Sequence, residues 1–248
     1  MSIDRVVVYS GGMDSYSLLR QVHRRSGIAA HNLRKPEEGR LFVISFQYSQ
    51  RHAKELDCVQ TVCRKLGNLP LIIVDLPFLH MFNNSALVGH EPIPHGHYAA
   101  DVMKKTVVPG RNTVMLSTAL AFAEGLDSDA KRPAIVYYGA HSGDHHIYPD
   151  CRPEFIKAMQ ATFLAASDGR VSLRAPFVNQ TKGSLLLEAI QDGVLPAEYA
   201  DTWTCYEGGE HPCGKCGSCV ERAEAFAFAG VDDPLITLRD RIDQSATG

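Results

Sequence analysis

Residues 6–15 read Val-Val-Val-Tyr-Ser-Gly-Gly-Met-Asp-Ser, and they carry the strongest indication of the fold. The β-branched run at 6–9 is typical of a buried parallel strand, and residues 14–25 carry apolar side chains at helical spacing. The glycine pair between them lets the backbone turn sharply and approach a ligand closely. Free N–H groups at the helix start then favour an anion. The stretch therefore predicts a strand, an anion-binding turn and a helix.

Three polar side chains accompany the glycine pair. The hydroxyls of Ser10 and Ser15 can donate to phosphate oxygens, whereas the Asp14 carboxylate is repelled by a phosphate unless a cation bridges them. We therefore expect a nucleotide with Mg²⁺ here, and catalytic roles for Ser10, Asp14 and Ser15. The run lacks the Gly-Lys-Ser/Thr ending of a P-loop and the Gly-x-Gly-x-x-Gly of dinucleotide folds. A turn that only joins strand to helix is the alternative.

Strand and helix signals alternate along the chain. We expect further strands at 41–46, 71–74, 134–138 and 171–174, and helices at 52–66, 112–124, 154–166, 182–190 and 220–228. This order implies an α/β fold with a Rossmann-like parallel sheet covered by helices on both faces. The stretch 77–110, rich in Pro, Gly and His, is a long loop of the kind that often forms a functional lid. The composition changes near residue 196, which predicts a nucleotide-binding domain (1–195) and a small C-terminal region (196–248) packed on it.

Composition narrows the class of protein. The chain has 248 residues, is 45% hydrophobic and carries 25 basic against 28 acidic residues, a net charge of −3. Such a chain buries a core, which excludes disordered and fibrous proteins, and its mild acidity disfavours nucleic acid as a direct partner. No apolar run approaches about 18 residues, and no basic-plus-apolar leader precedes the first strand. We expect a cytoplasmic protein that does not associate with a membrane.

Four of the seven cysteines fall within one C-terminal run with the spacing Cys-x₇-Cys-x₂-Cys-x₂-Cys, namely Cys205, Cys213, Cys216 and Cys219. Two Cys-x-x-Cys steps let thiolates converge on one tetrahedral Zn²⁺, and four protein ligands leave no open position. We expect a structural zinc site that staples a small lobe, with disulfides and an iron–sulfur cluster as alternatives. His211 could substitute as a ligand. Cys58 and Cys63 lie on a helical stripe and are expected in the core.

The Ser-Gly-Gly-x-Asp-Ser run after an N-terminal strand resembles the signature loop of the ATP pyrophosphatase (PP-loop) superfamily. The resemblance implies an adenine nucleotide alpha hydrolase-like fold, in which this loop binds the pyrophosphate of ATP and the enzyme adenylates a carbonyl or carboxylate oxygen. It leaves the substrate open. The ATP-binding residues that it implies are Tyr9, Ser10, Gly11, Gly12, Met13, Asp14, Ser15, Tyr16, Ser17, Leu18, Leu19 and Arg51.

Further segments resemble the 7-cyano-7-deazaguanine synthase family of queuosine biosynthesis. They are Gln-Tyr-Ser-Gln-Arg-His at 47–52, Pro-Gly-Arg-Asn at 109–112, Tyr-Pro-Asp-Cys-Arg at 148–152 and Thr-Trp-Thr-Cys-Tyr at 202–206, followed by the cysteine run. The matches lie in order from Val6 to Pro234 and cover nearly the whole chain. The chain departs from the family pattern at 16–17, where Tyr-Ser replaces Thr-Thr, at Ser49, which replaces Gly, and at 145–147.

This second resemblance implies that the carboxylate of 7-carboxy-7-deazaguanine is converted to a nitrile with ammonia, through adenylated intermediates. The implied cofactors are ATP, Mg²⁺ and Zn²⁺, and the implied assembly is a homodimer. Arg51 and Arg111 would stabilise the developing pyrophosphate, which gives Arg111 a catalytic role. The substrate carboxylate needs a guanidinium or ammonium group beside it. The guanine-like edge offers N–H donors, which need an acceptor such as a carboxylate. The implied substrate-binding residues are Gln50, Asp144, Asp150, Arg152 and Lys182.

Structural roles and other functions stay open at these positions. Arg51, Arg111 and Lys182 could be solvated charges near helix starts, and Asp150 with Arg152 could cap the helix that begins at residue 153. Cys151 is expected to be non-catalytic, because ATP supplies the activation. Four loop histidines (His95, His97, His145 and His146) are expected to be solvated rather than metal-bound. The alternative functions are an enzyme on the same scaffold that stops at the amide or joins another amine, a tRNA-modifying PP-loop enzyme, and a nucleotide-binding regulatory module.

Overall fold

The computed structural model describes residues 2–27, 39–48, 54–82, 85–88, 92–98, 101–127 and 132–236. Within these ranges five strands form one sheet: β1 (Asp4–Val8), β2 (Leu41–Gln47), β3 (Leu71–Asp75), β4 (Ala134–Tyr137) and β5 (Val171–Arg174). The α-helices are α1 (Met13–Ser26), α2 (Lys54–Lys65), α3 (Arg111–Gly125), α4 (Pro153–Ala166), α5 (Lys182–Gln191) and α6 (Gly217–Ala229). The 3₁₀ helices are η3 (Pro77–Phe82), η4 (Asp101–Thr106), η5 (Ser142–His146), η6 (Pro149–Cys151) and η7 (Pro196–Asp201).

The sheet is parallel throughout, in the order β3-β2-β1-β4-β5. Val6 on the central strand aligns with Phe42 on one side and Val136 on the other. The chain moves outward from β1 to β3 and then returns to add β4 on the opposite side of β1. The strand order thus reverses between β1 and β4. In open α/β sheets, ligands bind at such a switch point, outside the carboxyl ends of the strands.

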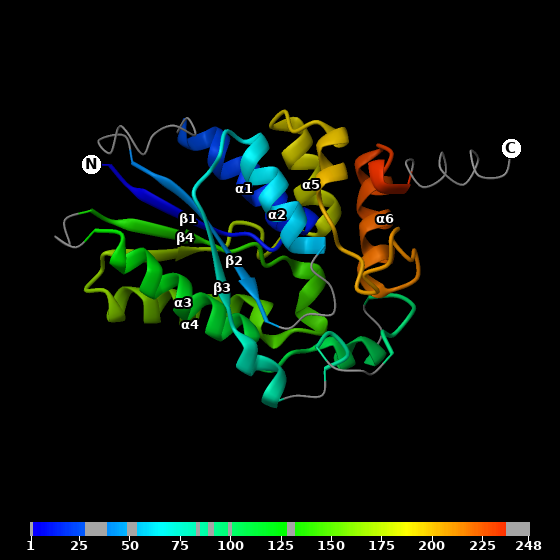
Figure 1. Ribbon diagram of the computed structural model, residues 1–248, viewed down its shortest axis with the longest axis horizontal. Helices are drawn as coiled ribbons and strands as arrows, with labels where there is room; N and C mark the ends of the chain where they lie inside the picture. The colour runs from blue at the N-terminus through cyan, green and yellow to red at the C-terminus, as the bar shows by residue number, and fades with distance from the viewer. Residues whose placement is uncertain are drawn as a thin grey trace, which may run out of the picture.

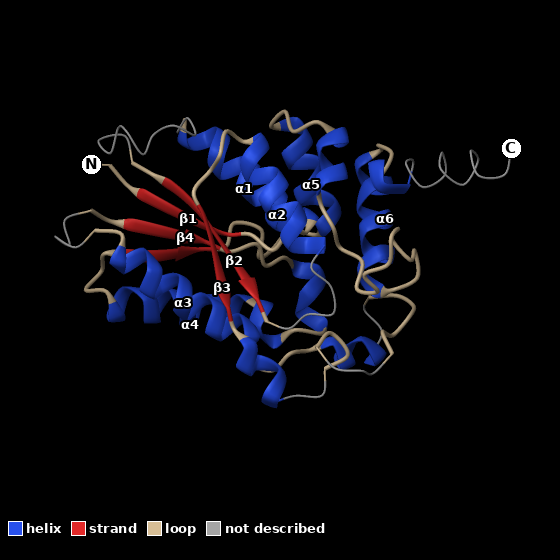
Figure 2. Cartoon of the chain, viewed as in Figure 1, coloured by secondary structure: helices blue, strands red, loops and turns tan. Residues whose placement is uncertain are grey.

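Helices cover both faces of the sheet, as Figures 1 and 2 show. On one face, Val7 and Val43 of the strands pack with apolar side chains of α1, α2 and α5. On the other, Val6, Val8 and Ile44 pack with side chains of α3 and α4. Because successive strand residues point to opposite faces, the unbroken Val6-Val7-Val8 run supplies both layers. The predicted fold class is therefore confirmed.

The C-terminal region packs against this sandwich. α6 lies beside α5 (Figure 1), and its Phe226 belongs to the same buried cluster as Leu185 of α5. Trp203 and three of the four C-terminal cysteines belong to the cluster under α3 and α4. The domain boundary at 195/196 stays a prediction. In the described part of the chain, no helix is long and apolar enough to cross a membrane.

The predicted elements match the observed ones closely. The described strand and helix ends differ from the predictions by at most three residues, and β5 coincides with its predicted range. The start predicted for the second helix, at residue 52, lies outside the described residues. The long loop at 77–110 contains η3 and η4, and its role as a lid stays a prediction.

Candidate active site and metal centre

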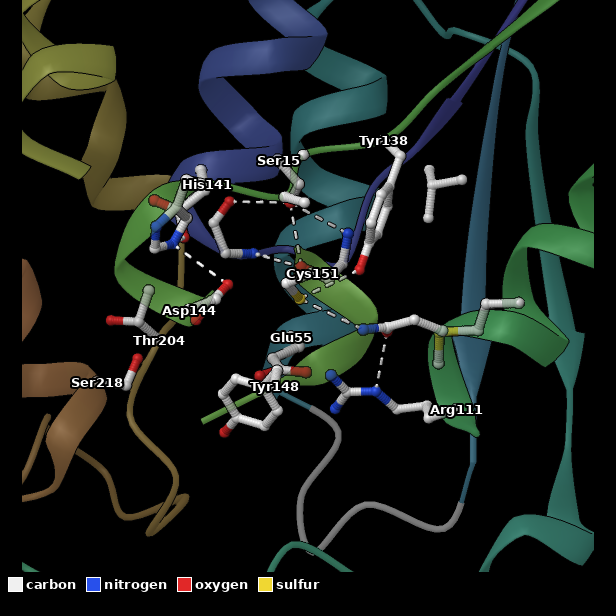
Figure 3. A pocket seen from close by; sticks show the side chains of 18 of the residues that line it. Ser15, Glu55, Arg111, Tyr138, His141, Asp144, Tyr148, Cys151, Thr204 and Ser218 are labelled. Atoms are coloured by element: carbon white, nitrogen blue, oxygen red, sulfur yellow. Dashed lines mark hydrogen bonds and ion pairs between the residues drawn. The ribbon is translucent and has the colours of Figure 1, made fainter. Parts of the chain in front are cut away.

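A cavity of about 220 Å³ opens at the carboxyl ends of β1 and β4, at the switch point of the sheet (Figure 3). Ser10, Gly12, Asp14 and Ser15 line it after β1, and residues 138–141 line it after β4. The starts of α2, α3 and α5 and the C-terminal region complete the wall. The parallel topology therefore places the motif found in the sequence where ligand binding is expected.

Two serine hydroxyls organise the loop between β1 and α1. The Ser10 N–H donates to Ser15 Oγ at 3.2 Å, and the two Oγ atoms lie 3.0 Å apart. Ser15 Oγ also donates to the Gly12 carbonyl at 3.1 Å. Gly12 is the N-cap residue of α1 and makes no side-chain cap bond. The start of α1 thus lies at the cavity with no side chain capping its N–H groups, which suits an anion.

Gly11 holds the loop against α2. Its φ of +92° lies in the left-handed region, and a Cβ there would come within 2.9 Å of the Glu55 carbonyl carbon. Only glycine permits both the backbone conformation and the close approach. The first turn of α2 is consequently seated directly on the loop.

The predicted ATP-binding residues divide into two groups. Five line the cavity, namely Tyr9, Ser10, Gly12, Asp14 and Ser15. The others in the described part of the stretch are Gly11, which lies against α2, and Met13, Tyr16, Ser17, Leu18 and Leu19, whose side chains are buried in the protein. Tyr16 donates to Glu198 at 2.8 Å, and Ser17 bonds Tyr199 at 2.7 Å, so both polar groups are used within the protein. Arg51 and Gln50 lie outside the described residues.

A buried ionic network forms one end of the cavity. Lys182 Nζ, at the start of α5, lies 2.6 Å from Glu221 Oε2 of α6 and 3.2 Å from Asp14 Oδ2. His141 Nε2 lies 3.4 Å from the same Asp14 oxygen and 3.5 Å from Asp144 Oδ2. Lys182, Glu221 and His141 are each less than 10% exposed. Three carboxylates and two basic groups thus meet beside the anion-binding loop.

Burial and neighbouring charges shift the pKa values of these groups in opposite directions. Burial alone would raise the pKa of Asp14, but Lys182 and His141 beside it hold that pKa well below its usual range. Burial would lower the pKa of Lys182, and Asp14 and Glu221 raise it instead. The pKa of Glu221 is raised, chiefly by burial. Asp14 is therefore ionised and Lys182 protonated at neutral pH.

This network also has the chemistry of a cation site. His141, Asp144 and Glu221 each offer one ligand atom, and these three atoms lie within 4.8 Å of one another. Asp14 Oδ1 is buried and has no hydrogen-bond partner among the described residues. Carboxylate oxygens suit Mg²⁺, and the neighbouring loop suits phosphate. The residues present are compatible with a divalent cation, which His141, Asp144 and Glu221 would hold beside the anion-binding loop.

Arg111 lies at the other end of the cavity, on the first turn of α3 (Figure 3). Its guanidinium donates to Tyr48 Oη at 3.3 Å and to Asn112 Oδ1 at 3.3 Å. Both partners are neutral, so the positive charge remains available to a ligand. Beside it, Cys151 Sγ lies 3.6 Å from Asn112 Nδ2, and burial raises the pKa of this thiol well above its usual value. Cys151 is thus a protonated, weakly nucleophilic part of the wall.

Two predicted substrate residues do not line the cavity. Asp150 Oδ2 accepts a bond from the Asn112 N–H at 3.4 Å, at the start of α3. Arg152 is exposed, donates from Nε to the His145 carbonyl at 2.8 Å and is the N-cap residue of α4. Asp144 and Lys182 do line it. Asp150 therefore bonds the start of α3 rather than that of α4, and Arg152 occupies the N-cap position of α4 without a side-chain cap bond, so neither side chain caps the helix at 153 as the alternative expected.

Sequence reasoning missed several residues of the cavity. His141 and Glu221 complete the ionic network, and Tyr138, Tyr148 and Tyr206 supply aromatic walls. His141 had a positional signal, because it follows a strand that was predicted correctly. Glu221 sits in an ordinary helical pattern two residues after Cys219, and no pattern in the sequence marks it.

The cysteine quartet forms a compact cluster on the C-terminal region. The four sulfur atoms lie within 4.8 Å of one another, and those of Cys213 and Cys219 are 4.0 Å apart. A tetrahedral zinc with Zn–S bonds of about 2.3 Å places neighbouring sulfurs about 3.8 Å apart. The N–H groups of Lys215 and Cys216 donate to Cys213 Sγ, which supports a thiolate there. The cluster can therefore hold a metal ion such as zinc.

The distances between the cysteine sulfurs also disfavour the two alternatives, disulfide bonds and an iron–sulfur cluster. The separation of the Cys213 and Cys219 sulfurs is about twice a disulfide bond. In a four-iron cluster each thiolate binds a different iron, which would hold the sulfurs farther apart than one shared ion does. His211 is not part of the group of possible ligands. Cys63 is buried in the core and Cys58 packs partly buried against it, which confirms the expectation for both.

Comparison with known proteins agrees with this geometry. The family described as "Queuosine biosynthesis protein QueC" matches residues 4–230. The chain belongs to this family. It is 47% identical to the 7-cyano-7-deazaguanine synthase of Marinomonas sp. (strain MWYL1), over 95% of this chain and 98% of that protein. It is 45% identical to the synthase of the same name from Marinobacter nauticus, over 93% of this chain and 95% of that protein. The residues matched by the family thus include both the loop after β1 and the cysteine quartet.

Proposed function

We propose that the chain is a 7-cyano-7-deazaguanine synthase, which uses ATP to convert the carboxylate of 7-carboxy-7-deazaguanine and ammonia into the nitrile. The names of its relatives indicate a synthase with this product. The observation that carries the proposal is that an anion-binding loop, a carboxylate-rich ionic network and a guanidinium face one cavity. Activation of a carboxylate by a nucleotide needs all three.

The ionic network supports a role in binding ATP with Mg²⁺. Pyrophosphate is strongly anionic, and the carboxylates of Asp14, Asp144 and Glu221 outnumber the basic groups beside them. A divalent cation would reverse that repulsion and neutralise the charge that develops as pyrophosphate leaves. The N–H groups after Gly12 would hold the phosphate oxygens in place.

Arg111 and the aromatic walls support binding of the deazaguanine. With only neutral hydrogen-bond partners among the described residues, Arg111 can pair with the substrate carboxylate or the α-phosphate. Lys182 is already paired with two carboxylates, so we assign it to holding Asp14 rather than to the substrate. Tyr138, Tyr148 and Tyr206 offer ring faces to a planar base.

Turnover with the proposed substrates tests the function. The purified protein is incubated with 7-carboxy-7-deazaguanine, ammonium, ATP and Mg²⁺, and AMP release and product mass are followed. We expect AMP only when the carboxylate is present, and a product with the mass of the nitrile. Absence of carboxylate-dependent AMP would overturn the proposal. A product that stops at the mass of the amide would replace it with the amide-forming alternative.

Asp14→Asn tests the role of the Asp14 charge, since it keeps the shape of the side chain and removes the charge. We expect turnover to fall by at least about 10²-fold while the thermal unfolding curve stays cooperative. Full activity in this variant would remove Asp14 from the phosphate and metal chemistry.

A further inference from the structure

Glu55 lies in the first turn of α2, at the point where this helix rests on the anion-binding loop. Its backbone carbonyl is the group that a Cβ at Gly11 would strike, and its Cα is 3.1 Å from that Cβ position. Its side chain lines the same cavity as Ser10, Asp14 and Arg111. In the view of Figure 3 it lies between the ionic network and Arg111. Glu55 is thus a carboxyl group beside the place where the phosphates are expected.

Its surroundings differ from those of the other carboxyl groups in the cavity. Asp14, Asp144 and Glu221 are held by Lys182 and His141. Among the described residues, the Glu55 carboxyl has neither a hydrogen-bond nor an ion-pair partner.

Burial raises the pKa of Glu55 to about 7, and Arg111 offsets part of that effect. Among the residues that the structure describes, the other titratable groups whose charges interact with it are Tyr48, after β2, and Cys58, on its own helix. Burial raises the pKa values of both, so they stay neutral. Glu55 can therefore exchange a proton near neutral pH.

The proposed reaction needs a proton acceptor three times, once in the first half and twice in the second. When ammonia adds to the acyl adenylate, the new C–N bond leaves a positive nitrogen that must lose a proton as AMP departs. In the second half, the amide oxygen takes AMP from a second ATP, pyrophosphate leaves, and the amide nitrogen gives up the first of its two protons. The resulting adenylated imidate becomes a nitrile only if its nitrogen loses its last proton. Neither Asp14, which is ionised with a strongly lowered pKa, nor protonated Lys182 can accept these protons effectively.

We propose that Glu55 is the general base of both half-reactions. In the first, its carboxylate takes a proton from the attacking nitrogen, while the C–O bond to AMP breaks and its electron pair stays with AMP. In the second, it takes one amide proton as the oxygen is adenylated and the C=N double bond forms, and passes that proton to solvent. It then takes the remaining proton of the imidate, whose N–H electron pair forms the third C–N bond as AMP leaves with the C–O pair. This assignment rests on the proposed function and adds a catalytic residue to it.

Glu55→Gln tests the assignment, because it keeps the shape of the side chain and removes its basicity. Asp57→Asn is the matched control, since Asp57 is an exposed acid in the same helical turn. Exchange of labelled pyrophosphate into ATP, dependent on the carboxylate, reports the adenylation step alone. Steady-state AMP release, with free ammonia held constant at each pH, reports the complete reaction.

We expect Glu55→Gln to retain the exchange and to lose about 10²–10⁴-fold in kcat, with the KM for ATP unchanged. The fall of wild-type kcat below about pH 7 should disappear in this variant, persist in Glu55→Asp and be unaffected in Asp57→Asn. Thermal unfolding of each variant establishes that it is folded.

Two results would overturn the assignment. One is a kcat of Glu55→Gln within a few-fold of wild type. The other is a raised KM for the base or for ATP with an unchanged pH profile, which would make Glu55 a binding residue. Failure of the wild type to show carboxylate-dependent exchange would instead overturn the proposed function, so the two failures are distinguishable.

Discussion

Lys182→Met removes a buried ammonium group that contacts two carboxylates. Lys182 is 6% exposed, and its Nζ lies 2.6 Å from Glu221 and 3.2 Å from Asp14. Methionine keeps most of the volume of the apolar stem, so the change is chiefly one of charge. Removing one partner of a buried ion pair costs about 3–5 kcal/mol, because the other charge stays buried and uncompensated. In a chain of this size that loss corresponds to a fall in Tm of roughly 6–20 °C.

The loss should also depend on pH. In the wild type, the lowered pKa of Asp14 contributes stability that is present above about pH 4 and is lost as the pH falls through its folded value. The raised pKa of Lys182 contributes stability that is present below about pH 10 and is lost at higher pH. Without the ammonium, burial raises the pKa values of Asp14 and Glu221, and protonation relieves their repulsion. The difference between variant and wild type should therefore shrink from about pH 8 to about pH 5.

Urea unfolding of both proteins at each pH measures this difference. Lys65→Met is the matched control, because Lys65 pairs with Asp201 at 2.6 Å but is 62% exposed. Exposed pairs contribute little, so we expect the control to lose at most about 1 kcal/mol. Equal losses in the two variants, or a loss at Lys182 that does not change with pH, would refute the account of the network.

Three further predictions concern the loop, the cysteine cluster and the C-terminal region. Gly11→Ala should lower turnover at least about tenfold and reduce the free energy of unfolding in urea by about 1–3 kcal/mol. Gly27→Ala is its control and should leave turnover unchanged, because Gly27 also has a positive φ, of +62°, but has open space where a Cβ would lie. Cys216→Ser should lower bound zinc from about one per chain and reduce the Tm, measured by metal analysis and calorimetry; full zinc content would exclude Cys216 as a ligand. Arg222→Met should cost about 3–5 kcal/mol in urea unfolding, because Arg222 is 3% exposed and bonds Asp233 at 2.7 and 2.9 Å; a loss below about 1 kcal/mol would contradict this.

The elements of the fold could be predicted because their signals are local. Runs such as Val6-Val7-Val8 predict strands wherever they occur, and glycine pairs and Cys-x-x-Cys steps have few structural uses. These signals gave the sheet, the loop after β1 and the cysteine cluster.

The cavity was less predictable because its residues meet only through topology. His141 follows β4, Lys182 begins α5 and Glu221 lies on α6, so nothing in the spacing of these residues relates them. Helical periodicity would have separated Leu18 and Leu19 from the phosphate-facing side chains, since the same apolar spacing that predicts the helix directs them into the core. The resemblance to the signature loop instead assigned all of residues 9–19 to ATP binding.

Oxygen-18 transfer tests the central claim, activation of the substrate carboxylate by ATP in this cavity, most directly. The protein is given 7-carboxy-7-deazaguanine labelled with oxygen-18 in its carboxylate, together with ammonium, ATP and Mg²⁺, and the AMP and pyrophosphate are analysed by mass spectrometry. The account predicts that the label appears in AMP and not in pyrophosphate, because the carboxylate and then the amide oxygen attack the α-phosphorus. Unlabelled AMP, or label in phosphate or pyrophosphate, would contradict it.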